Sequence, residues 1–312
     1  MKIKLFFLII LIQIGMIFLF LFKIQQKNNN TLGISINFID PKAIQRTPVE
    51  GLKYFYEPKA NSSEEIKKSW LPYVAKYTIN NDALNERFNY DIQKKEDVFR
   101  IITLGDSFTF GQNVSTDRNW TELLEDYLNT HQICNKVKKY EVINLGVYSY
   151  DTQYEVERYR IRGQKYNPDL VVWTFIDLER INEQMIPLVQ QNDATAVNKE
   201  LEKKGVYNDN WRIAREDMIR RIGQTGIINF QEKQIKRLNE YYKGQLIYVA
   251  MPNKPEYISL LQQKAKERAH SYFFQPYIQW KQPGLFLPDD HFNDTGHKKM
   301  THKNSILTLT VN

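Results

Sequence analysis

Short apolar runs alternate with longer, more polar segments along the chain from about residue 98 onward. Five of these runs have the length of a strand and are rich in β-branched and aromatic residues, which predicts buried β-strands. They cover residues 99–104, 141–143, 168–174, 245–250 and 271–274. The first run is followed directly by a polar stretch that contains glycine, as expected where a buried strand reaches the edge of a sheet.

The segments between these runs carry helical periodicity. In the first of them, five apolar residues follow the spacing of one buried helix face: Trp120, Leu123, Leu124, Tyr127 and Leu128. Further helices are expected over about 152–162, closed by Gly163, around 235–242, stopped by Gly244, and at the end of the chain. Strands that alternate with helices predict an α/β fold, a doubly wound parallel sheet flanked by helices on both faces.

The N-terminal pattern is different, because residues 5–22 are almost wholly apolar. A run of about 18 or more such residues predicts a transmembrane helix. No small-x-small site follows it, so we expect an uncleaved anchor over residues 1–27, with a cleaved signal peptide as the alternative. Lysines flank the run in nearly equal number on both sides, and the N-terminal amine adds positive charge to the first side. This favours a single-pass membrane protein with its N-terminus inside and its folded domain outside the cytoplasm.

The rest of the chain divides by composition into two parts. Residues 28–97 are polar with scattered aromatic side chains, which indicates a linker and an N-terminal extension that packs on the main domain. Residues 98–312 form that domain. Within it, residues 182–226 are charged and weakly periodic, so we expect an insertion or lid rather than core.

Composition narrows the possible functions. The single cysteine, Cys134, excludes an internal disulfide framework and a cysteine-based zinc site. The net charge of +7 suits a domain near an anionic membrane or wall polymer. The basic residues do not form the aromatic-interleaved cluster of a nucleic-acid reader, so no nucleic-acid partner is expected. No nucleotide-binding or metal-binding motif is present, so we expect no cofactor and no metal.

The candidate chemistry begins at Ser107, which follows the first strand. In a parallel α/β sheet the reacting groups lie at the carboxyl ends of the strands. A serine nucleophile needs a histidine base that a carboxylate orients, and Asp289 and His291 stand two positions apart late in the chain. Asp290 is a second candidate orienter. His297 is a second candidate base, although we expect it to cap the terminal helix.

Three blocks around these residues resemble the SGNH hydrolases, also called the GDSL family. Gly105-Asp106-Ser107 resembles the first block, the segment from Asn144 to Thr152 the second, and Asp289-Asp290-His291 the last. Residues 77–80 and 99–101 are also similar to the lead-in of membrane-anchored bacterial members. The resemblance implies a flavodoxin-like three-layer fold with Ser107 as nucleophile, His291 as base and Asp289 as acid.

The resemblance also implies an oxyanion hole, which holds the negative charge that develops on the substrate oxygen. Its expected donors are the backbone N–H groups of Ser107 and Gly146, although Gly146 can also be a simple turn glycine. A third donor in this family is usually an asparagine side chain, and this chain has Asp177 or Leu178 at that place. Asp177 would have to be protonated to donate a hydrogen bond there, be turned away, or be used to bind substrate.

The function that these patterns favour is a serine esterase or O-acyltransferase, with O-acetyl as the expected group. Its expected partners are an ester-bearing carbohydrate outside the cytoplasm and the membrane that holds the anchor. A lipid or thioester hydrolase is one alternative. A surface-binding protein with weakened catalysis is the other, because the usual oxyanion-hole asparagine is missing.

Overall fold

The computed structural model describes residues 44–131, 133–193, 210–251 and 254–301. Its centre is a sheet of five parallel strands in the order β6-β5-β7-β8-β9. The strands are β5 (Val98–Leu104), β6 (Lys139–Asn144), β7 (Leu170–Phe175), β8 (Gln245–Ala250) and β9 (Ser271–Phe274). The five predicted strands are therefore confirmed, and their order is that of a flavodoxin-like doubly wound sheet.

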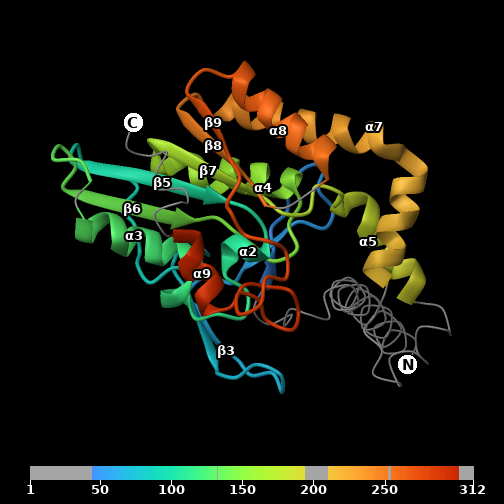
Figure 1. The fold of residues 1–312 in the computed structure, drawn as a ribbon, viewed down its shortest axis with the longest axis horizontal. Coiled ribbons are helices and arrows are strands. Elements are labelled where there is room, and N and C mark those ends of the chain that lie inside the picture. Colours follow the sequence, from blue (N-terminus) through green and yellow to red (C-terminus); the bar gives the residue numbers. More distant parts are fainter. Residues whose placement is uncertain (1–43, 132, 194–209, 252–253, 302–312) are drawn as a thin grey trace, which may run out of the picture.

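Helices cover both faces of this sheet (Figure 1). On one face, α3 (Trp120–His131) and α9 (Asp294–Thr301) pack on one core cluster. On the other, α4 (Thr152–Arg158), α7 (Asn210–Tyr241) and α8 (Pro255–Glu267) pack on a second. Both faces of the central strands are thus buried, which explains why these strands are apolar at nearly every position.

The helix that starts at Thr152 runs further than its sequence predicts. It continues through a π-helical turn, Tyr159–Gly163, and a 3₁₀ turn, Gln164–Tyr166, and ends at Asn167 in the left-handed region. Gly163 was expected to close the helix, but it is helical, with φ −72°. A Cβ there would lie 2.7 Å from Leu145 Cδ1, so the glycine lets the helix approach the sheet closely.

The described part of the N-terminal extension forms two antiparallel strand pairs that pack on the main domain. One pairs β1 (Ile44–Arg46) with β2 (Tyr56–Pro58), and the other pairs β3 (Ser62–Ile66) with β4 (Ala75–Ile79). Their aromatic side chains share a core cluster with side chains of the main domain: Phe55, Tyr56 and Tyr77 with Phe110, Tyr148 and Tyr150. The extension is therefore part of the folded body, as expected.

The described residues of the segment 182–226 are helical. Its first part is α5 (Asn182–Asp193), and its last part belongs to α7, which is kinked at Gly223 (φ 67°, ψ 172°). Met185 of α5 and Met218 of α7 are fully buried in a cluster shared by the two helices. This differs from the expected insertion outside the core, because the two helices bury apolar side chains against each other.

The expected membrane anchor, residues 1–27, lies outside the described residues. Among the helices of the described ranges, none has the length and apolar character needed to span a bilayer.

Candidate active site

Ser107 is the first residue of a short helix, α2 (Ser107–Phe110), which begins where β5 ends. Asp106 caps this helix, because its carboxylate accepts a hydrogen bond from the Phe108 N–H at 3.0 Å. Gly105 makes the sharp turn possible: its φ is 155°, and a Cβ would lie 2.1 Å from Thr109 Oγ1. The serine is thus held at the carboxyl edge of the sheet with its own N–H free of intrahelical bonds.

The structure brings Ser107, His291 and Asp289 into one hydrogen-bonded row. His291 Nε2 lies 2.8 Å from Ser107 Oγ, and His291 Nδ1 lies 3.1 Å from Asp289 Oδ2. Asn113 donates a further hydrogen bond to Asp289 Oδ2 at 2.6 Å. The three residues come from positions up to 184 apart in the chain, and they meet as the sequence predicts.

The electrostatics of this row favour an ionised Asp289. Burial by itself would raise the pKa of this carboxyl group. The hydrogen bond from His291, the charge of His291 and the charge of Lys68 outweigh burial, and the net pKa is lowered. A carboxylate that stays ionised can orient the imidazole and stabilise the imidazolium that forms when His291 takes a proton.

The two rival residues are engaged elsewhere. Asp290 pairs with Lys281, with 3.0 Å between Oδ2 and Nζ. His297 is 1% exposed, and its Nδ1 accepts a hydrogen bond from the Trp120 N–H at 3.2 Å. It therefore caps the start of α3. This corrects the expectation that His297 caps the terminal helix. Burial, together with the charge of His291, lowers the pKa of His297 to about 3, so this imidazole is neutral.

Gly146 does not have the free N–H that its expected role requires. Its N–H donates to Asn144 Oδ1 at 2.8 Å, and a Cβ on this glycine would lie 2.3 Å from the Phe110 N atom. The glycine thus allows the loop after β6 to pack against α2. This corrects the expectation that Gly146 is an oxyanion-hole donor, because a donor already bonded within the protein is not available to substrate.

Ser149, three positions later, lines the same cavity as Ser107 and was missed by the sequence analysis. Its φ is 51°, in the left-handed region that few residues other than glycine adopt. Asn182 Nδ2 donates a hydrogen bond of 2.8 Å to the carbonyl oxygen of Ser149. No described residue accepts a hydrogen bond from the Ser149 N–H. Since no glycine marks the turn, the sequence carries no signal for this conformation.

Asp177 was expected to take the place of the oxyanion-hole asparagine. Its Oδ2 instead accepts a hydrogen bond from Arg215 Nη2 at 2.5 Å and lies 3.7 Å from Arg180 Nε. It is not among the residues that line the cavity of Ser107. This corrects the expectation for Asp177, because its carboxyl group is held by two guanidinium groups and does not line the cavity of Ser107.

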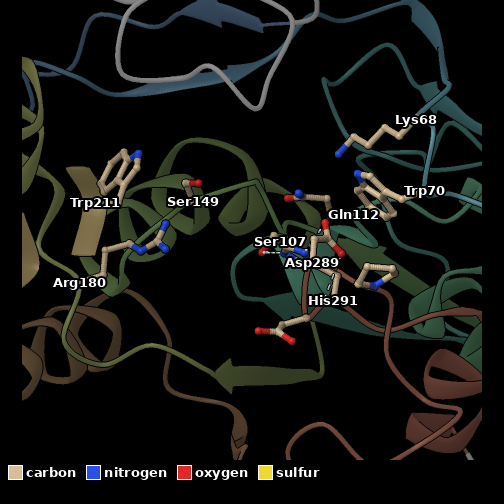
Figure 2. A pocket seen from close by; sticks show the side chains of 11 residues that line it. Lys68, Trp70, Ser107, Gln112, Ser149, Arg180, Trp211, Asp289 and His291 are labelled. Carbon is tan, nitrogen blue, oxygen red and sulfur yellow. Dashed lines mark hydrogen bonds and ion pairs between the residues drawn. The ribbon is translucent and has the colours of Figure 1, made fainter. Parts of the chain in front are cut away.

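The cavity at Ser107 has a volume of about 530 Å³ (Figure 2). Besides the row of Ser107, His291 and Asp289, the cavity is lined by side chains from distant segments that were not predicted as site residues: Lys68, Trp70, Gln112, Ser149, Arg180 and Trp211. Lys68 and Trp70 come from the turn between β3 and β4, so the N-terminal extension forms one wall. Trp70 also packs with Leu287, just before the loop that carries Asp289 and His291.

Comparison with known proteins found no matching family model and no matching curated protein. Among solved structures, the chain is similar to TesA (12% identity, TM-score 0.40, covering 65% of this chain and 93% of that one). It is similar to the esterase EstA from Pseudoalteromonas sp. (14%, 0.40, 68% and 99%). It is also similar to the family 3 carbohydrate esterase of Clostridium thermocellum (17%, 0.38, 65% and 92%). These likenesses are too distant to carry a statement about activity.

Proposed function

We propose that this protein is a serine-dependent ester hydrolase or acyltransferase. The observation that carries this proposal is the row Ser107 Oγ, His291 Nε2, His291 Nδ1 and Asp289 Oδ2, with distances of 2.8 and 3.1 Å. Hydroxyl, imidazole and carboxylate in this order are what nucleophilic acyl transfer requires. The row opens into a cavity large enough for a substrate of moderate size.

In the proposed reaction, His291 Nε2 takes the proton of Ser107 as Oγ attacks the ester carbonyl carbon. The tetrahedral intermediate collapses, the bond to the leaving oxygen breaks, and His291 returns the proton to the leaving alcohol. Water or a sugar hydroxyl then attacks the acyl-serine in the same way and regenerates Ser107. Asp289 stays ionised throughout and stabilises the imidazolium.

The developing oxyanion would be held by three donors. Two are the backbone N–H groups of Ser107 and Ser149, which belong to residues that line the cavity. The third is the side chain of Gln112, the one amide side chain among the described cavity-lining residues, which Figure 2 shows beside Ser107. Gln112 would replace the asparagine that usually supplies this donor in the family that the sequence resembles.

The proposed substrate is an O-acylated carbohydrate, with acetyl as the expected acyl group. Two half-buried tryptophans in the cavity, Trp70 and Trp211, support this proposal, because the apolar face of a sugar ring packs well on an indole. Charged side chains also line the cavity, namely Lys68, Arg180 and Asp290, which disfavours a long lipid chain.

Labelling with a fluorophosphonate probe tests the proposal, because only an activated serine reacts with it. We expect the parent protein to label at Ser107, and the variants Ser107→Ala and His291→Gln to lose both labelling and turnover of an aryl acetate. Triad variants typically lose roughly 10⁴-fold or more in turnover. A folded parent protein that neither labels nor cleaves the ester would instead support the surface-binding alternative.

We also propose that the domain is held on the outer side of a membrane by the apolar segment 5–22. An extracytoplasmic position would place the site next to acylated surface carbohydrates. Protease treatment of intact cells or spheroplasts should then digest the domain while cytoplasmic proteins survive. Full protection of the domain would contradict the proposed orientation.

A further inference from the structure

Two cations stand on opposite sides of Ser107 in the cavity, and each is stacked on a tryptophan. Figure 2 shows Arg180 and Trp211 on one side, and Lys68 and Trp70 on the other. The Arg180 guanidinium carbon lies 5.5 Å from the centre of the Trp211 ring, and Lys68 Nζ lies 4.9 Å from the centre of the Trp70 ring. Stacking on an indole holds a cation in place without neutralising its charge.

Among the residues that the structure describes, the charge of Arg180 is only partly balanced. The nearest described carboxylate is that of Asp177, at 3.7 Å from Nε, and Arg215 holds that carboxylate more closely, at 2.5 Å. Arg180 Nε is buried and has no hydrogen-bond partner among the described residues. One carboxylate shared by two guanidinium groups leaves a positive charge at the cavity wall.

Other acids near Arg180 do not remove this excess. Asp106, Asp151 and Glu155 interact with Arg180 through space. Each of them accepts a hydrogen bond from another group: Asp106 from the Phe108 N–H, Asp151 from the Tyr154 N–H and Glu155 from Trp173 Nε1. No hydrogen bond joins any of the three to Arg180 among the described residues.

The acids that line the cavity itself are also engaged. Asp289 is bound to His291 and Asn113, and Asp290 is paired with Lys281. Lys68 is half-buried, and burial lowers the pKa of its ammonium group, although the charges of Asp289 and Glu64 act in the opposite direction. Figure 2 shows its ammonium group directed toward the cavity rather than away from it. The cavity therefore presents positive charge at both ends and polar donors at its centre.

From this arrangement we propose that the natural substrate is an acidic saccharide, with its esterified sugar at Ser107 and an anionic group on Arg180. The inference rests on the proposed function and names its substrate class. A planar guanidinium matches the two oxygens of a carboxylate or phosphate, and Trp211 offers the adjoining sugar a flat apolar face. Lys68 and Trp70 would hold the neighbouring unit on the other side of the scissile ester.

Binding to the full-length Ser107→Ala protein tests this inference without turnover. The probes are an O-acetylated hexuronate oligosaccharide, an O-acetylated sugar phosphate and a neutral O-acetylated xylo-oligosaccharide, compared by calorimetry. We expect at least one acidic probe to bind about tenfold more tightly than the neutral one, with a preference that shrinks as salt screens the charges. The two acidic probes distinguish a carboxylate from a phosphate as the recognised group.

Matched variants in the same background locate the effect. Arg180→Gln and Lys68→Gln should each reduce the preference for the acidic probe by about fivefold to tenfold, since each removes a charged contact. The controls Arg220→Gln and Lys67→Gln remove the same charge from side chains that are 74% and 67% exposed, and they should keep the preference.

The outcomes separate this inference from the proposed function. Equal binding of the acidic and neutral probes overturns the proposal of an acidic substrate. So does a loss of the preference for acidic probes in the control variants that equals the loss in Arg180→Gln and Lys68→Gln. Either result holds even when Ser107 labels with fluorophosphonate. A preference for acidic probes that depends on Arg180 supports it even when the parent protein shows no labelling, in which case only the esterase proposal fails.

Discussion

Arg158 Nη1 donates a hydrogen bond of 2.7 Å to Glu57 Oε1, and neither side chain has any exposed surface. Glu57 belongs to the N-terminal extension and Arg158 to the helix after β6, so the pair joins the two parts of the chain. Arg162 adds a second contact to Glu57, at 2.9 Å. Because the extension also carries Lys68 and Trp70, this buried pair helps to hold one wall of the active-site cavity in place.

We predict that Glu57→Gln lowers the free energy of unfolding by about 3 kcal/mol or more, because it leaves the Arg158 charge buried without its partner. Urea denaturation measures this loss. The control Glu65→Gln affects an ion pair whose carboxylate is 50% exposed, and it should leave the stability nearly unchanged, because water screens exposed ion pairs. Equal effects of the two variants would contradict the structural role of the pair.

Substitutions of the two histidines near the C-terminus should have different effects, His297→Gln on stability and His291→Gln on turnover. The pKa of His297 is about 3 in the folded state and has its ordinary value of 6.5 in the unfolded state. The contribution of neutral His297 to the free energy of unfolding is therefore complete above pH 6.5, and it is lost as pH falls toward 3. The slope from this residue is at most about 1.4 kcal/mol per pH unit. We predict that His297→Gln removes this slope while keeping turnover, whereas His291→Gln abolishes turnover. Loss of turnover in His297→Gln, with the fold intact, would reverse the assignment of the base.

A buried acid beside β6 should make stability fall with rising pH. Burial raises the pKa of Glu125 to about 7, although hydrogen bonds from Val142 and Tyr90 act in the opposite direction. Ionising Glu125 in the folded state costs free energy that the unfolded state does not lose. This loss of stability is absent below the ordinary pKa of 4.5 and complete above about pH 7. We predict that Glu125→Gln is more stable than the parent by about 2–3 kcal/mol at pH 8, and nearly equal at pH 5.

Thermal or urea unfolding at several pH values measures this difference. The control Glu240→Gln replaces an exposed carboxylate on α7, and its difference from the parent should not change with pH. A Glu125→Gln difference that is the same at pH 5 and pH 8 would show that the glutamate is ionised in the folded protein at both.

The proposed third oxyanion donor makes a kinetic prediction. Gln112→Ala should lower kcat for an aryl acetate by about 10²–10³-fold with little change in KM, because the donor acts on charge that develops only in the transition state. Steady-state kinetics measure both constants. The control Gln164→Ala removes an exposed amide and should behave as the parent does. An unchanged kcat in Gln112→Ala would leave the oxyanion to the N–H groups of Ser107 and Ser149 alone.

Strands β7 and β8 were predictable because both of their faces are buried, so each appears as a largely apolar run. The strand pairs of the extension were not predicted. β3 is polar in composition, and the alternation of buried and exposed residues in β4, a strand pattern, covers five residues only. Helix α8 was also missed, although it begins with Pro255 at its first position, a favourable start for a helix.

Within the candidate site, the row of Ser107, His291 and Asp289 was predictable, and most of the residues that shape the cavity were not. Ser107 follows an apolar strand, and Asp289 and His291 form a local motif, so each carries a signal in its own neighbourhood. Ser149 has a left-handed backbone, but no glycine at this position marks it in the sequence. Gly146 is compatible with two roles, an oxyanion-hole donor or a turn glycine. The contact of Gly146 with Asn144 and Phe110 was needed to choose between them.

The sequence by itself determined the alternation of strands and helices and the carboxyl edge at which the reacting groups meet, because both follow from local periodicity and chain order. Only the tertiary structure decided which of two histidines lies within hydrogen-bond distance of Ser107, where Asp177 points, and that Lys68 and Arg180 face one cavity. These depend on contacts such as that of His297 with Trp120, which lie 177 positions apart. Distances of this kind are set by the packing of the whole chain, and no local pattern encodes them.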